Sequence, residues 1–189
     1  MTSGCRLFVA FTLLAGSLCI GAPRKAPELA FTVPGQGQKL LSQYRGKVVA
    51  LEFIATTCPH CQDASRVMTR FQQEFGSRGF QALDVATNAL DDSPDPNNAN
   101  AVVAKFVKDF QVGFPVGWAT RDQFMSFMSF SVLDRVVIPQ LVLIDRKGII
   151  HYETPAGSTP ERESLMKEDA IRQHIEELLG RTDAHKRAH

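Results

Sequence analysis

Two cysteines, Cys58 and Cys61, stand in the sequence Cys-Pro-His-Cys. A Cys-x-x-Cys pair on the first turn of a helix closes a disulfide with little backbone movement, so it can cycle between dithiol and disulfide. Half of a zinc site and a structural bridge are the alternatives. Zinc takes about four ligands, and the sequence has no second Cys-x-x-Cys and no close pair of histidines. The motif therefore predicts a redox-active pair.

The elements around the motif predict where the two thiols lie. The apolar run that begins at Val48 and ends in the cysteine motif is rich in β-branched and aromatic residues, which indicates a central strand covered on both faces. After Cys61 the apolar residues recur at steps of three and four, as in an amphipathic helix that ends at Gly76. This stripe consists of Ala64, Met68, Phe71 and Phe75. The cysteines therefore stand where a buried strand ends and a helix begins.

That junction predicts different roles for the two thiols. Pro59 suits the first helical turn, because its missing N–H would be unpaired there. Cys58 then occupies the cap, where free backbone N–H groups and the helix dipole favour the thiolate. Cys61, three residues later, faces back toward the same place. We expect Cys58 to be the nucleophile and Cys61 to resolve the mixed disulfide.

Two further residues are candidates for the site. His60 lies between the cysteines, where its donors and partial positive charge can hold the Cys58 thiolate and make the disulfide more oxidising; an exposed helical residue without a role is the alternative. Glu52 is the one acid in the strand. If it points inward, burial raises its pKa and makes it a base for Cys61. The alternative is an outward-facing residue at the strand margin.

The first part of the chain resembles a known group of proteins. The resemblance runs from Ala26 to Cys61 and rests on Ala26-Pro27-Glu28-Leu29, Leu40-Leu41, Arg45-Gly46-Lys47-Val48-Val49 and Phe53-Ile54-Ala55 before the cysteines. In order and spacing these segments are similar to exported thioredoxin-like proteins of the TlpA/ResA group, within the AhpC/TSA-redoxin-like superfamily. Cys-Pro-His-Cys itself resembles the DsbA motif. Thr57 departs from the group, which usually has Trp before the first cysteine.

The resemblance implies a fold and further site residues. It implies an α/β thioredoxin-like fold with a central mixed β-sheet flanked by helices. Pro139, at the start of an apolar strand, matches the cis-proline of the family, and the backbone of Ile138 before it would pair with a bound polypeptide. Gln140 stands where many relatives carry Thr. Many TlpA-like relatives carry Asn where this chain has Glu52. Thioredoxins have a buried acid at the matching position, so Glu52 resembles thioredoxins whereas the surrounding sequence resembles the TlpA group.

The remaining elements follow from local signals. We expect a strand at 81–86, a polar loop at 88–100, a helix at 101–110, a short strand at 114–118, a helix opened by a capping box at 120–123, a strand hairpin at 140–153 and a last helix ended by Gly180. The second of these helices is rich in Phe and Met over 124–130. It is either buried in the core or an adaptable surface for a protein substrate.

Composition and the two ends complete the prediction. The chain has 189 residues with 21 basic and 20 acidic side chains, so it lacks the charge excess of a nucleic-acid-binding protein. Residues 1–22 are typical of a secretory signal, or alternatively an N-terminal membrane anchor. Removing them leaves only Cys58 and Cys61 as thiols. We expect a thioredoxin-like domain at 23–180, a flexible tail at 181–189, and a periplasmic or otherwise extracytoplasmic location.

The predicted function is thiol-disulfide oxidoreductase activity on protein thiols and disulfides, served by a redox partner protein. We expect a monomer without cofactor or metal. The alternative is a copper-binding or metallochaperone-type module that uses the two thiolates with a nearby His or Met. A peroxidase is disfavoured, since the Pro and Thr pattern before a peroxidatic cysteine is missing. TlpA-like relatives mostly reduce, whereas Pro-His between the cysteines favours oxidation, so the direction stays open.

Overall fold

The computed structural model describes residues 23–186, with side chains as far as Arg181. Its strands are β1 (Arg24–Lys25), β2 (Ala30–Val33), β3 (Gly37–Leu40), β4 (Val48–Ile54), β5 (Phe80–Ala86), β6 (Val116–Trp118), β7 (Gln140–Ile144) and β8 (Ile149–Glu153). Its helices are η1 (Leu41–Tyr44), α1 (Pro59–Phe75), η2 (Gly76–Arg78), α2 (Pro96–Phe110), α3 (Arg121–Met128), α4 (Pro160–Leu165) and α5 (Glu168–Lys186). The predicted signal or anchor at 1–22 lies outside the described residues. Within the described range, no helix is long and apolar enough to cross a membrane.

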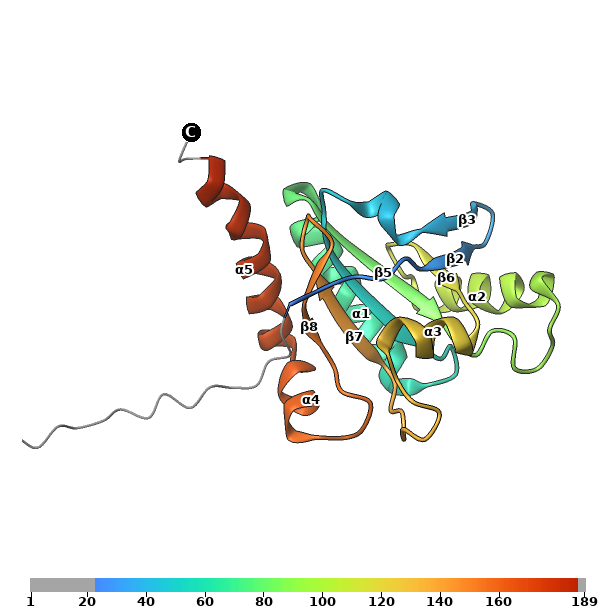
Figure 1. Ribbon diagram of the computed structural model, residues 1–189. Helices are drawn as coiled ribbons and strands as arrows, with labels where there is room; N and C mark the ends of the chain where they lie inside the picture. The colour runs from blue at the N-terminus through green and yellow to red at the C-terminus, as the bar shows by residue number, and fades with distance from the viewer. Residues whose placement is uncertain (1–22, 187–189) are drawn as a thin grey trace, which may run out of the picture.

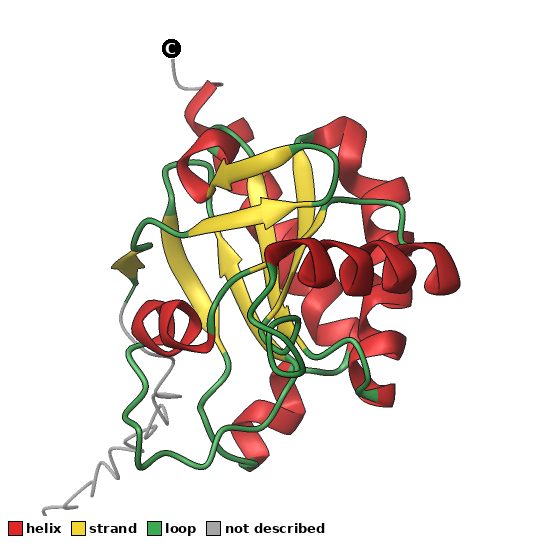
Figure 2. Cartoon of the chain, turned by 90° about the vertical axis from the view of Figure 1, so that its right-hand side faces the viewer, coloured by secondary structure: helices red, strands yellow, loops and turns green. Residues whose placement is uncertain are grey.

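The strands form one mixed sheet in the order β1-β8-β7-β4-β5-β6-β2-β3. β4 is parallel to β5 and antiparallel to β7, and all seven of its residues are buried. In Figure 1, α5 lies at the left beside β8 and α2 lies at the right; Figure 2 shows helices on either side of the strands. The predicted α/β architecture with a central mixed sheet is confirmed.

The side chains of β4 alternate between two cores, as the pleat of a strand requires. Val48, Ala50 and Ile54 pack with residues of α1, α2 and α5. Leu51 and Phe53 point the other way, into a core that includes α3 and the N-terminal strands. Burial on both faces explains why the sequence of this strand is an almost unbroken apolar run.

Helix α1 has the limits that its sequence predicts. It begins at Pro59 with Cys58 at the cap and is followed by Gly76. Its apolar stripe packs on the face of the sheet that carries Ala50, with Met68, Phe71 and Phe75 almost wholly buried. The helix therefore crosses the strands with its N-terminus fixed at the end of β4.

Helix α3 belongs to the core. Thr120 and Gln123 form the predicted capping box, in which the side chain of each accepts a hydrogen bond from the backbone N–H of the other. Phe124 and Phe127 are buried, and their rings lie 4.8 and 5.4 Å from the ring of Phe53. Of the two interpretations of this Phe- and Met-rich segment, the structure supports the core helix.

Two predicted element limits are wrong. The polar loop ends at Asp95, which caps α2 at Pro96, because its side chain accepts from the backbone N–H of Asn97 and proline suits the first turn. The last helix is two helices, α4 and α5, and α5 continues through Gly180 to Lys186. Gly180 is not among the glycines with positive φ, so it does not form the left-handed cap that ends a helix.

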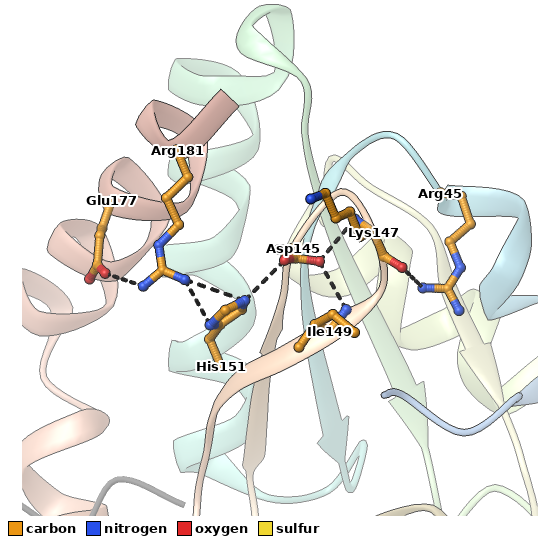
Figure 3. A network of polar contacts seen from close by, with 7 residues as sticks. All are labelled: Arg45, Asp145, Lys147, Ile149, His151, Glu177 and Arg181. Carbon is orange, nitrogen blue, oxygen red and sulfur yellow. Dashed lines mark hydrogen bonds and ion pairs between the residues drawn. The ribbon is translucent and has the colours of Figure 1, made fainter. Parts of the chain in front are cut away.

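A polar network joins Arg181, the residue after Gly180, to the hairpin of β7 and β8 (Figure 3). Arg181, predicted as part of a flexible tail, donates to His151 Nδ1 at 2.8 Å and to Glu177 at 2.6 Å. His151 Nε2 lies 3.0 Å from Asp145, which also accepts from the backbone N–H groups at the turn between β7 and β8. The network ties α5 to that hairpin through Arg181.

The aromatic contact between α3 and β4 predicts a large effect on stability. Phe124→Ala should lower the free energy of unfolding by about 3–5 kcal/mol, because it removes a fully buried ring and leaves a cavity. Leu133→Ala, at a residue that is 91% exposed, is the control and should change it by no more than about 0.5 kcal/mol. Urea unfolding followed by circular dichroism measures both; equal effects would contradict the packing of α3.

Candidate active site

The two cysteines lie at the junction of β4 and α1, as predicted, and differ in exposure. Cys58 is partly exposed and is the N-cap residue of α1, whereas Cys61 has no exposed surface. Both are free thiols in the structure. The backbone N–H of Ala55, in the loop after β4, points at Cys61 Sγ at 3.5 Å. A reagent from solvent therefore reaches Cys58 first.

Burial controls the chemistry of the second thiol. The pKa of Cys61 is raised well above its usual range, first because burial disfavours the thiolate. Hydrogen bonding to the Cys58 thiol and the negative charges of Cys58 and Glu52 act in the same direction, and the Ala55 N–H opposes them. Cys61 thus stays protonated until a base removes its proton.

Glu52 points inward, so the outward alternative is excluded. It lies on the face of β4 that α1 covers and has no exposed surface. Burial raises its pKa well above the ordinary value, and the neighbouring Asp84 carboxyl raises it further. Glu52 is also one of the charges that act on Cys61. The acid therefore lies near enough to the buried thiol for its charge to oppose the thiolate.

Sequence reasoning missed Asp84 and Ser65. Asp84 on β5 is the register partner of Glu52 on β4, and it is equally buried. The hydroxyl of Ser65 on α1 lies 2.5 Å from Asp84 Oδ2 and 3.0 Å from the carbonyl of Cys61. Asp84 is the one acid in an apolar strand, the same signal that selects Glu52. Only the register, however, places the two side by side.

The predicted proline loop also reaches the site. The Ile138–Pro139 peptide bond is cis, as the resemblance implied. Gln140 is the register partner of Phe53, so Pro139 lies beside the end of β4, where the chain turns toward the cysteines. Ile138 packs against the same core cluster as Cys58. The structure therefore brings together residues that are about 80 positions apart in the sequence.

Side chains outside the motif hold this loop. The amide of Gln140 donates to the carbonyl of Val137 at 2.5 Å, and its oxygen accepts from Thr154 at 2.5 Å. Arg162 on α4 is buried and donates to the carbonyl of Pro139. Its guanidinium also interacts with the charge of Cys61. No local pattern in the sequence marks Arg162, because its partners lie more than 20 residues earlier.

The other motif residues lie at the surface. Thr57, Pro59 and His60 are exposed on the approach to α1 and on its first turn. In the part of the chain that the structure describes, no three His, Cys, Asp or Glu side chains are grouped as a metal site would need. None of the contacts described above favours the copper-binding alternative over a redox pair.

Comparison with known proteins identifies the family. A profile described as the AhpC/TSA family matches residues 23–153. The chain belongs to the AhpC/TSA family. It is 26% identical over 153 residues to a thiol-disulfide oxidoreductase ResA of Geobacillus kaustophilus, which covers 81% of this chain and 75% of that protein. The ResA of Bacillus thuringiensis subsp. konkukian is 24% identical over 140 residues, or 74% of this chain and 72% of the relative.

Two further matches widen the comparison. A thiol:disulfide interchange protein of the thioredoxin family from Chlorobium tepidum TLS superposes with a TM-score of 0.63 at 21% identity, over 84% of this chain and 98% of that one. A glutathione peroxidase 8-B sequence of Xenopus laevis is 32% identical over 76 residues, and the chain spans only 36% of that relative. The thioredoxin-like fold and the resemblance to the ResA group are confirmed. The predicted class, a thiol-disulfide oxidoreductase of this family, is confirmed with them.

The buried acid predicts how stability depends on pH. The folded protein raises the pKa of Glu52 above its ordinary 4.5, so below pH 4.5 the carboxyl is neutral in both states. As pH rises from there toward the raised pKa, the unfolded chain ionises first and folding loses stability. Glu52→Gln removes this loss. The wild type should therefore lose stability relative to the variant as pH rises above 4.5 toward the raised pKa of Glu52.

Urea unfolding at several pH values measures this difference. Glu163→Gln, at an exposed acid on α4, is the control and should follow the wild type at every pH. A constant offset between Glu52→Gln and the wild type across the range would show that Glu52 does not resist ionisation in the folded state.

Proposed function

We propose that Cys58 and Cys61 exchange a disulfide with cysteines of other proteins outside the cytoplasm. One observation carries the proposal. Cys58, at the start of α1, is partly exposed, whereas Cys61, one helical turn later, is fully buried and lies near the acid Glu52. One thiol can meet a large partner while the other, shielded from solvent, completes the reaction. A two-step disulfide exchange needs one accessible thiol for the first attack and a second thiol to resolve the mixed disulfide.

The reaction can be followed in the reducing direction. The Cys58 thiolate attacks one sulfur of a substrate disulfide, a new S–S bond forms, and the other substrate sulfur leaves as a thiolate. Cys61 then loses its proton and attacks Cys58 Sγ. The Cys58–Cys61 disulfide forms, and the first substrate sulfur leaves with the electron pair. Oxidation of a substrate dithiol is the same path in reverse.

The remaining predicted residues receive supporting roles in this proposal. Pro59 starts α1 and so helps to keep Cys58 at the cap, where the helix dipole favours its thiolate. His60 stabilises the same thiolate by its donors and partial charge. The backbone of Ile138, next to Pro139, offers an edge for an extended polypeptide substrate. These assignments are supported by the positions of the residues around the end of β4.

The location and assembly are also proposals. The apolar segment at 1–22 is typical of an export signal or an anchor, and it contains both cysteines besides the pair, Cys5 and Cys19. A mature protein without them would have no other thiol to scramble with the active pair, which suits an oxidising compartment. We propose an exported or membrane-anchored monomer that works with a separate redox partner protein.

The difference in exposure predicts which thiol reacts first. Brief alkylation of the reduced protein followed by peptide mapping should label Cys58, because Cys61 is buried and protonated. With a peptide disulfide, Cys61→Ser should accumulate a mixed disulfide, whereas Cys58→Ser should form none. Preferential labelling of Cys61, or a stable adduct on Cys61 in the Cys58→Ser variant, would reverse the assignment.

The role of His60 predicts a change in redox potential. His60→Pro should make the pair more reducing by at least about 30 mV, a tenfold change in the equilibrium constant, because a group that stabilises the thiolate is lost. Equilibration with glutathione redox buffers measures the potential. An unchanged or more positive potential would leave His60 without this role.

A further inference from the structure

Two carboxyl groups, Glu52 and Asp84, lie side by side beneath α1. They occupy register-paired positions on the parallel strands β4 and β5, which in a sheet lie about 4.8 Å apart. Both side chains point to the face that α1 covers, and neither has exposed surface. Small residues, Ala82 and Ala86, flank Asp84 on this face. The two carboxyls are therefore neighbours in the buried core.

The hydrogen bonds around the pair are incomplete if both groups are ionised. Asp84 Oδ2 accepts from Ser65 Oγ at 2.5 Å, but Asp84 Oδ1 and both oxygens of Glu52 lack a donor among the described residues. Two adjacent buried carboxylates without a cation are costly, and one proton held between them removes most of this cost. The Ser65 donor favours the charge on Asp84, so the proton resides mainly on Glu52.

The side chains around the carboxyl pair limit which groups can exchange a proton with it. The register partners of Glu52 on β7 and of Asp84 on β6 are the apolar residues Leu141 and Val116. Apolar side chains of α2 and α5 belong to the same core cluster. Among the described residues, the side chains whose charge or hydrogen bond acts on Cys61 are Glu52, Cys58 and the Arg162 guanidinium, and Tyr152 and His174 stack on each other at the edge of the same core cluster. Cys61 is thus a buried thiol on which the charge of Glu52 acts.

We propose that Asp84 is a positioning residue of the disulfide exchange: it forms a carboxyl pair with Glu52 that holds one proton at rest, and once Glu52 has lost that proton, the charge on Asp84 favours the return of a proton from Cys61. When Cys61 attacks the mixed disulfide, its proton passes to the pair, the Cys58–Cys61 bond forms, and the substrate sulfur leaves as a thiolate. The reactive pair carries two negative charges before this step and one after it, so the rate of this step rises with pH as the resting proton is lost. Asp84 acts through Glu52, because its charge makes Glu52 the stronger base. This inference rests on the proposed function.

The reaction of the reduced protein with 5,5′-dithiobis(2-nitrobenzoate) tests the inference without a protein substrate. Attack by Cys58 releases a first coloured thiol, and resolution by Cys61 releases a second. In the wild type, the rate of the second phase should rise with pH. Asp84→Asn should move the midpoint of this rise to lower pH while leaving the first phase unchanged. Glu52→Gln should slow the second phase by about 100-fold or more.

A double variant separates action through Glu52 from direct action on Cys61. Adding Asp84→Asn to Glu52→Gln should change nothing further. An unchanged midpoint in Asp84→Asn, or an equal shift in the Glu52→Gln background, would overturn the inference. Asp63→Asn, at an exposed acid on α1, is the matched control and should follow the wild type. Failure to exchange with protein disulfides would instead count against the proposed function, since both coloured phases would remain.

A measurement on the wild type covers the case in which a variant does not fold. Carbon-13 NMR of the side-chain carboxyls should show Glu52 and Asp84 responding to the same two titration steps, because a coupled pair releases its protons jointly. Two independent single-step titrations would overturn the inference.

Discussion

The packing of α1 across β4 and β5 determines the geometry of the site. The helix buries Met68, Phe71 and Phe75 against the sheet. That contact fixes the position of its first turn relative to the end of β4. As a result, Cys58 is partly exposed at the surface and Cys61 is buried in the core. A looser contact would admit water around Cys61, and the raised pKa of its thiol depends first on the exclusion of water.

The same packing makes the polar groups beneath the helix interdependent. Glu52, Asp84 and Ser65 come from three different elements, and none of them has solvent as an alternative partner. In such surroundings each hydrogen bond or charge changes the protonation of its neighbours more than it would at the surface. On the other side of Cys61, Arg162 joins α4 to the proline loop. The Cys61 thiol therefore interacts with both an acidic and a basic side chain.

Local signals in the sequence were sufficient for the central elements. The apolar run of β4, the cap at Cys58, the stripe of α1 and the capping box of α3 each depend on residues within one or two turns, and the structure confirms them. What could not be predicted depends on register and on distant contacts. Asp84 stands out in its strand, yet only the pairing of β4 with β5 sets it beside Glu52.

The role of Arg162 and the division between α4 and α5 also depend on contacts between residues far apart in the sequence. A buried arginine whose partner is a carbonyl in another loop leaves no periodic trace in the sequence. The error at Gly180 has a different cause. A glycine ends a helix only when it adopts the left-handed conformation, and here contacts of Arg181 with His151 and Glu177 hold the chain beyond it.

The unequal exposure of the two thiols also bears on oxidative damage. A small oxidant meets Cys58 first, and the sulfenic acid that forms there has the Cys61 thiol within reach. Condensation of the two gives the ordinary disulfide and water, which is a reversible product. Oxidation to the irreversible sulfinic acid would require a second oxidant molecule to arrive before Cys61 reacts. The buried thiol thus protects the exposed one, and the enzyme returns to its own catalytic cycle.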